Sequence, residues 1–390
     1  MRDSTQGSQF KSKNLKKNKI NAKMSKKSLI SARKEGLKMM KKRLTPEQIL
    51  EDIVLVGIDA GFKNVKYAYE INNDVKTGMF ASAIELGEAD TCDAIDTFYV
   101  NDQPYNTATR KNLKDVAGSK TKNNQMVYAN MARAMFEISK ALNFTKTKFI
   151  VSLGCSIATY RDQEAKEQYR QDFLKNKTIK VKSHWTNLET ALIEYKEIEL
   201  EILDVLPAPE GVSGVYNVPD LKPTKPYALI DLGGYNSQIT EFQAKPNFET
   251  AICGCNGFDV LVEALVDKCA NANLCDNTTL IEGCINEMSE YKENKNEEMQ
   301  KIIQTIEKYI REDYVENVIK ASILKANMKL GIYTPVFLGG TAKILKPYLS
   351  EAFPDALYPD DMIYASAIGM YVRTKKHVRN NKNRYMVEGE

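Results

Sequence analysis

Two short stretches, far apart in the chain, show the same order of hydrophobic and polar positions. Residues 53–66 (IVLVGIDAGFKNVK) and 227–240 (YALIDLGGYNSQIT) each begin with an apolar run ending in an aspartate, Asp59 or Asp231. A glycine-bearing turn and a second strand-like segment follow in both. An apolar run that meets a glycine turn is typical of a buried strand leading into a hairpin. The sequence therefore predicts two β-hairpins of one design.

Outside the hairpins, the apolar pattern alternates between short strand-like runs and longer segments of helical spacing. Such alternation, passed through twice, predicts an α/β protein with a sheet in each half. The Pro/Gly-rich stretch 207–226 is the predicted boundary between the halves, and 79–124 reads as irregular. The remaining predicted strands are 148–153, 179–181, 195–205, 251–254 and 335–338, and the predicted helices are 125–142, 162–175, 259–269, 298–330, 341–345 and 361–372.

Composition and charge separate a folded body from a basic arm. With 390 residues, 43% of them hydrophobic, the chain is long enough for two domains with a true core. Residues 1–43 hold 15 Lys and Arg against two acidic residues, whereas the rest holds 40 against 49. We interpret 1–43 as a disordered arm, either a solvated tail or a contact for nucleic acid or neighbouring copies. Residues 374–390 are a second basic tail.

Our expectations about compartment and membrane contact depend on the lengths of the apolar runs and on the cysteines. It shows no apolar run long enough to span a membrane and no apolar segment behind the basic N-terminus that would suggest a secretory signal. Seven cysteines, an odd number, suit reduced thiols, so we expect a cytoplasmic protein without membrane contact. Five of them (Cys253, Cys255, Cys269, Cys275 and Cys284) crowd together; a zinc site is conceivable, but the spacing favours reduced thiols.

The residues that could perform chemistry lie in the turns. The chain has neither of the common glycine-rich nucleotide motifs, and its two histidines lie near no recognisable nucleophile, which disfavours triad hydrolysis and His-based zinc sites. Backbone N–H groups at glycines can approach a polyphosphate, and an Asp at a strand end can hold hydrated Mg²⁺. The candidates are Asp59, Gly61 and Lys66 in the first hairpin, Asp231, Gly233 and Gly234 in the second, and Gly339, Gly340 and Thr341 before a helix.

These three motifs, in this order, resemble the actin/Hsp70/sugar-kinase superfamily. They look like its two phosphate loops and its adenosine motif, and 365–369 (ASAIG) is similar to its second connecting helix. Residues 149–155 (FIVSLGC) and 207–214 (PAPEGVSG) resemble segments of the plasmid-segregation actins of the ParM/StbA type. The resemblance covers roughly residues 53–373. It implies actin-like duplicated domains with RNase H-like halves and a nucleotide cleft between them: domain I over 44–226 with 346–373 packing back on it, and domain II over 227–345.

The resemblance also implies roles for single residues. Glu210 would position the attacking water, Asp59 and Asp231 would hold Mg²⁺ through water, and Lys66 would contact the phosphates. Asp259 would lie close to the ribose. Two residues depart from the pattern, because Phe62 and Tyr235 stand where such loops carry Ser or Thr. A lost hydroxyl removes one possible hydrogen bond to the γ-phosphate, which suggests slow hydrolysis or a backbone N–H in its place.

The implied function is an ATPase, using ATP or GTP with Mg²⁺, that polymerises into a filament and segregates plasmid DNA through a DNA-bound adaptor. Two alternatives stay open at this point. A small-molecule kinase of the same superfamily would need a catalytic Asp near a substrate hydroxyl, where this chain offers Glu210. A nucleotide-gated protein could instead bind nucleic acid through the arm 1–43.

Overall fold

The computed structural model describes residues 52–87, 97–107, 124–186, 190–254 and 257–385. The described residues all belong to one compact unit. The basic arm 1–43, and with it the start of the predicted domain I, lie outside the described residues, as does Cys255. The domain boundaries proposed above therefore stay predictions.

A nine-stranded mixed sheet carries the first hairpin. Its strand order is β3-β2-β1-β7-β9-β8-β5-β6-β4, and β1, β7 and β9 run parallel at its centre. The strands are β1 (Ile53–Ala60), β2 (Asn64–Ile71), β3 (Asp74–Ala81), β4 (Ala83–Leu86), β5 (Thr97–Val100), β6 (Gln103–Thr107), β7 (Lys148–Cys155), β8 (Thr178–Thr186) and β9 (Ile193–Pro209).

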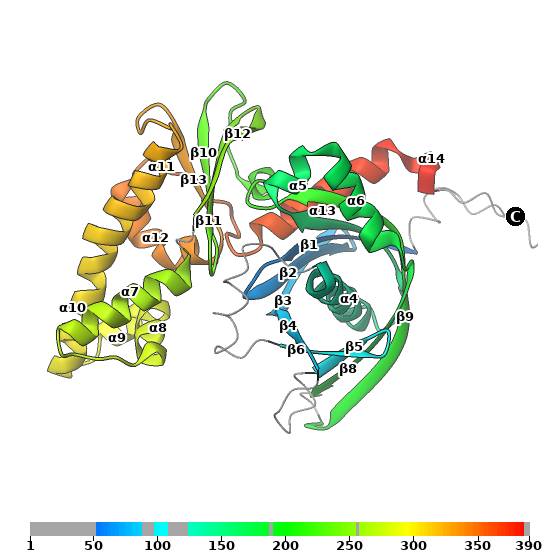
Figure 1. Cartoon of the computed structure of the whole chain (residues 1–390), viewed down its shortest axis with the longest axis horizontal. Helices are drawn as coiled ribbons and strands as arrows, with labels where there is room; N and C mark the ends of the chain where they lie inside the picture. The colour runs from blue at the N-terminus through cyan, green and yellow to red at the C-terminus, as the bar shows by residue number, and fades with distance from the viewer. Residues whose placement is uncertain (1–51, 88–96, 108–123, 187–189, 255–256, 386–390) are drawn as a thin grey trace, which may run out of the picture. The chain divides into compact units, whose positions relative to one another are not determined.

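Helices cover both faces of the central strands, which explains why β1 reads as a continuous apolar run. Val54, Val56 and Ile58 enter the core around α4 (Asn124–Ala141), a helix that the sheet curls around in Figure 1. The alternate residues face α13 (Ala365–Asn380). At Gly57 a Cβ atom would lie 2.2 Å from the Ala367 carbonyl oxygen, so only glycine permits this approach.

A four-stranded sheet, in the order β12-β11-β10-β13, carries the second hairpin. Here too the strand with the Asp is buried on both faces. Ala228 and Ile230 of β10 join a core with the helices, while Tyr227 and Leu229 join a smaller cluster with Val336. The elements are β10 (Tyr227–Leu232), β11 (Ser237–Gln243), β12 (Lys245–Gly254), β13 (Thr334–Leu338), α7 (Phe258–Asn271), α8 (Thr278–Asn286), α9 (Met288–Lys292), α10 (Glu297–Lys308), the π-helical η3 (Tyr309–Lys320), α11 (Ala321–Lys325) and α12 (Gly340–Ala352).

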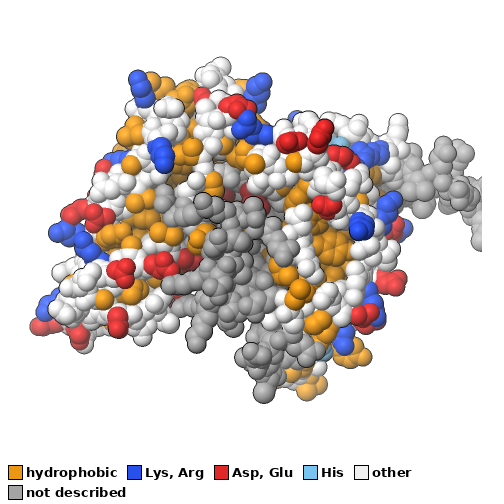
Figure 2. Space-filling view, in the orientation of Figure 1, with side chains coloured by type: hydrophobic (Ala, Val, Ile, Leu, Met, Phe, Trp, Pro, Cys, Tyr) orange, Lys and Arg blue, Asp and Glu red, His pale blue; other side chains and the backbone are white. Residues whose placement is uncertain are grey.

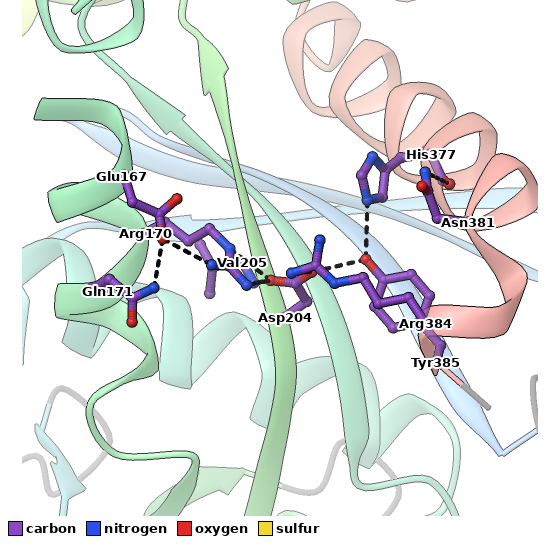
Figure 3. Close-up of polar contacts among 9 residues, drawn as sticks. All are labelled: Glu167, Arg170, Gln171, Asp204, Val205, His377, Asn381, Arg384 and Tyr385. Carbon is purple, nitrogen blue, oxygen red and sulfur yellow. Dashed lines mark hydrogen bonds and ion pairs between the residues drawn. The ribbon is translucent and has the colours of Figure 1, made fainter. Parts of the chain in front are cut away.

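Asp204 of β9 is a buried carboxylate, only 1% exposed, that binds the C-terminal segment. Arg170 donates to its Oδ1 from Nε at 2.9 Å and from Nη2 at 2.7 Å. Tyr385 donates its hydroxyl to Oδ2 at 2.8 Å, and Arg384 lies 3.3 Å from the same oxygen (Figure 3). Because both oxygens are paired, this charge can stay buried. The cluster joins α6 (Gln163–Leu174), β9 and α14 (Lys382–Tyr385).

Most predicted elements are confirmed, with shifted ends. The prediction that 79–124 is irregular is wrong for its described part, which contains the end of β3 and the strands β4, β5 and β6. The last predicted helix, 361–372, corresponds to α13, which begins at Ala365 and continues to Asn380, into the stretch predicted as a tail, because Thr374 and Val378 are buried. Five short helices were not predicted from the sequence: α5 (Ile157–Arg161), the 3-10 helix η2 (Ser213–Asn217), α8, α9 and α14.

No helix within the described ranges has the length and apolar character needed to cross a bilayer.

Candidate functional site

Both hairpin turns line one cavity of about 630 Å³. This volume lies within the range of small-molecule sites. Asp59 and Asp231, on two different sheets, both contribute to its wall. Of the predicted site residues, those that line it are Asp59, Gly61, Phe62, Lys66, Glu210, Asp231, Gly233, Gly234, Tyr235, Gly340 and Thr341.

In the first hairpin the strand register sets the charge pair. Asp59 and Lys66 are direct cross-strand partners of β1 and β2, with 3.8 Å between Oδ2 and Nζ. The turn is held from behind by Ser82, which donates its hydroxyl to the Gly61 carbonyl at 2.6 Å and its N–H to the Lys63 carbonyl at 3.1 Å. These two hydrogen bonds fix the backbone of the turn, and Asp59 and Lys66 on either side of it line the cavity.

The second hairpin repeats this arrangement with different side chains. Asp231 pairs across the strands with Gln238, as Asp59 does with Lys66. Thr341 donates its hydroxyl to the Gly233 carbonyl at 2.6 Å, as Ser82 does to that of Gly61. The cross-strand cation of the first hairpin is thus replaced by an amide in the second.

Glu210 follows directly after β9 and is fixed by its backbone. Its N–H donates to the Cys155 carbonyl at 3.0 Å, and its own carbonyl accepts from Gln238 Nε2 at 2.6 Å. The Glu210 side chain also packs over Gly154, where a Cβ atom would lie 3.0 Å from Cγ. Glu210 therefore lines the cavity from a strand end whose backbone is bonded to both sheets, through Cys155 of β7 and Gln238 of β11.

Gly339 does not line the cavity itself but stands behind Asp231. Its φ is +93°, and a Cβ atom there would lie 2.5 Å from Asp231 Oδ1. A side chain at this position would displace the carboxylate, which is why the turn before α12 needs glycine. Thr341 was predicted to bind the nucleotide; in this structure its hydroxyl donates to the Gly233 carbonyl of the second turn.

Asp259 lies at the start of α7, beside the cavity rather than in its lining. Its N–H donates to the Gly234 carbonyl at 2.8 Å, so the start of α7 is joined to the second turn. Burial raises the pKa of its carboxyl, and the Lys63 ammonium, 3.2 Å away, offsets part of this effect.

Several residues of this site were not predicted from the sequence. Gln238 could have been found, because it follows Asp231 by the same seven positions that separate Lys66 from Asp59. Ser82 could not be found in this way, because Ser82 and Thr341 lie at different distances along the sequence from the turns that they contact. Lys63, Glu282 and Lys343 also line the cavity and were not predicted.

The residues present fit a magnesium–nucleotide complex. Carboxylate oxygens at two strand ends suit a hydrated Mg²⁺, and the Lys66 ammonium suits a phosphate oxygen. Glycines bring backbone close to the cavity at both turns, where a polyphosphate can be bound.

Two other regions of the molecule have features of a binding site. A groove of about 1010 Å³ lies between the α5–α6 segment and the β11–β12 hairpin; Arg161 pairs with Glu249 there, and none of the predicted site residues lines it. Among the residues the structure describes, no three His, Cys, Asp or Glu side chains are grouped so as to hold a metal ion, which includes the described cysteines of the predicted cluster.

The sequence matches no protein-family model and no curated protein. Its fold, however, matches solved structures. Ta0583, an archaeal actin homologue, is 15% identical with a TM-score of 0.58, over 83% of this chain and 99% of that one. The Alp12 filament structure is 20% identical with a TM-score of 0.57, over 84% and 99%. ParM of Bacillus thuringiensis with AMPPNP is 15% identical with a TM-score of 0.59, over 84% and 99%. The chain therefore has the actin-like fold that the sequence motifs suggested.

Proposed function

We propose that this protein is an actin-like ATPase that binds ATP·Mg²⁺ in the cavity, polymerises, and segregates plasmid DNA in the cytoplasm. The observation that carries the proposal is the pair of Asp-Gly hairpins, one from each sheet, lining one cavity with Glu210. Support for polymerisation comes from the fold, because solved structures that share it include the Alp12 filament and ParM.

Hydrolysis would need positioning and electrostatics alone. Mg²⁺ would neutralise phosphate charge when bound. Asp59 and Asp231 would orient its water ligands, and Lys66 would contact a phosphate oxygen directly. Glu210 would accept a hydrogen bond from the attacking water and orient it. No covalent intermediate is required, as in other phosphoryl transfers of this kind.

The basic arm 1–43 would act outside this site, on nucleic acid or on neighbouring filaments, alongside a DNA-bound adaptor. Its charge contrasts with the folded part of the chain, where Figure 2 shows acidic and basic side chains interspersed over the described surface of this face. A long-range attraction for phosphate would thus reside in the arm.

The test of the proposal is phosphate release from ATP, measured with filament formation followed by light scattering and electron microscopy. Glu210→Gln should lower turnover by about 10²-fold, because water positioning typically contributes that much or more. Its affinity for ATP should stay unchanged, since the proposed role of Glu210 is to contact the attacking water and not the nucleotide. Glu199→Gln, an exposed residue of the same strand, is the matched control.

Two results would contradict the proposal. Turnover in Glu210→Gln equal to that of wild type would remove Glu210 from the mechanism. Phosphorylation of a sugar or acid by the wild-type protein, without ATP-dependent filaments, would favour the small-molecule kinase instead.

A further inference from the structure

Two neighbouring residues of the first turn, Phe62 and Lys63, contact the half of the molecule that carries the second hairpin. Phe62 and Tyr235 lie with ring centroids 6.0 Å apart at an interplanar angle of 59°. The two aromatic residues that replace Ser or Thr in the two turns thus contact each other. This spacing and tilt are typical of a favourable aromatic pair.

Lys63, the next residue, makes an independent set of contacts to the same half. Its ammonium lies 3.2 Å from Asp259 Oδ1, 3.3 Å from Glu282 Oε1 and 5.1 Å from the centroid of the Phe258 ring. The Lys63 stem packs against Gly234, where a Cβ atom would lie 3.2 Å from Lys63 Cβ. One side chain thus joins the first turn to the second turn, α7 and α8.

These contacts are partly shielded from solvent. The side chains of Lys63 and Asp259 are each 31% exposed, and that of Glu282 is 13% exposed. Screening is weaker here than for a fully exposed pair. We define the cross-cavity bridge as Phe62 and Lys63 with their partners Tyr235, Phe258, Asp259 and Glu282; it joins the first turn to the second turn, α7 and α8.

The cross-cavity bridge also lies in the wall of the site itself. All its members except Asp259 line the cavity, together with Asp59 and Asp231. A ligand that enters or leaves between the two turns must separate these contacts first. Opening of such a contact can set the rate of ligand release without changing the chemical step.

Resting on the proposed function, we propose that Phe62 and Lys63 are nucleotide-retention residues: their bridge to Tyr235, Asp259 and Glu282 slows the exchange of nucleotide. Lys63→Met keeps the apolar stem and removes the ammonium. Because Ser82 holds the backbone of the turn, the turn should keep its conformation in this variant.

The first measurement is dissociation of a fluorescent ATP analogue with Mg²⁺ by stopped flow. Lys63→Met should release it about three- to tenfold faster, the effect expected from two partly exposed ion pairs and one cation–π contact. Phe62→Ser with Tyr235→Thr should accelerate release further when combined with it. Lys76→Met, which removes an exposed ion pair of β3, is the matched control and should release at the wild-type rate. Equal rates in Lys63→Met and wild type would overturn the proposal.

A second measurement does not depend on nucleotide. Amide hydrogen exchange of the protein alone should speed up in Lys63→Met at residues 61–64 and 233–236 and stay unchanged in Lys76→Met. Unchanged exchange at both turns would overturn the proposal even if the protein bound no nucleotide, a result that would separately refute the proposed function. A third result would also overturn the proposal. If Lys63→Met bound nucleotide and showed faster amide exchange at the turns, but released nucleotide at the wild-type rate, the bridge would exist without governing retention.

Discussion

The two hairpins share a backbone plan but divide its tasks between them. Each places an Asp at a strand end, a glycine two positions later and a hydroxyl on that glycine's carbonyl, Ser82 in one case and Thr341 in the other. They differ at the cross-strand partner of the Asp. In the first hairpin this is Lys66, which pairs with the carboxylate; in the second it is Gln238, which donates to the Glu210 carbonyl.

This difference suggests that charge and positioning are separated. The first hairpin brings a cation to the cavity, where it can attract an anion, and the second holds the strand end that carries Glu210. Duplicated geometry thus need not mean duplicated chemistry. This division of tasks can be tested by substitutions in the residues that support the hairpins and in the hairpins themselves.

The largest effect is expected at Asp204, which supports the sheet of the first hairpin. Asp204→Ala leaves Arg170 without its buried partner and frees Tyr385, and should lower the free energy of unfolding by about 3 kcal/mol. Chemical denaturation followed by circular dichroism measures this. Asp172→Ala, on the exposed side of α6, is the control. A loss no larger than that of the control would show that the C-terminal segment does not stabilise this half.

The next effect separates the cross-strand partners. Lys66→Met should weaken ATP binding about tenfold or more, because a charged hydrogen bond is lost, with little change in kcat once the enzyme is saturated. Gln238→Met should lower kcat several-fold and leave KM near wild type, since it acts on Glu210 by positioning it. Steady-state kinetics of both variants measure the division. If both variants changed KM alone, the two hairpins would have the same task.

Local periodicity explains how much of this site was predictable. A hairpin whose strands pair residue by residue brings Asp59 and Lys66 together because a short turn fixes the register. The same rule leads to Gln238, which could therefore have been predicted. The actin-like fold was predicted from the repetition of this hairpin motif in the sequence.

Contacts between distant segments were not predictable in the same way. Lys63 is 196 residues from Asp259 and 219 from Glu282, and no local pattern links them. The strand β6 contains Pro104 and Asn106, residue types that are rare in strands, and it exists because β5 and β4 pair with it. The end of α13 reads as a basic tail in the sequence and is helical because Thr374 and Val378 are buried.

The smallest expected effect tests whether the two hydroxyl anchors are equivalent. Ser82→Ala and Thr341→Val each remove one hydrogen bond to a turn carbonyl and should each lower ATP affinity about two- to tenfold, the usual net value of such a bond. Thr145→Val removes a comparable bond to the Leu142 carbonyl on an exposed loop and serves as the control. Thr341→Ser should restore wild-type affinity, since the hydroxyl is kept. Because the anchors act on different turns, their effects should add in the double variant. A loss of affinity in Thr341→Val alone would mean that the strand pairing of β2 with β3 suffices to place the first turn, so that the symmetry of the two hairpins is one of shape and not of support.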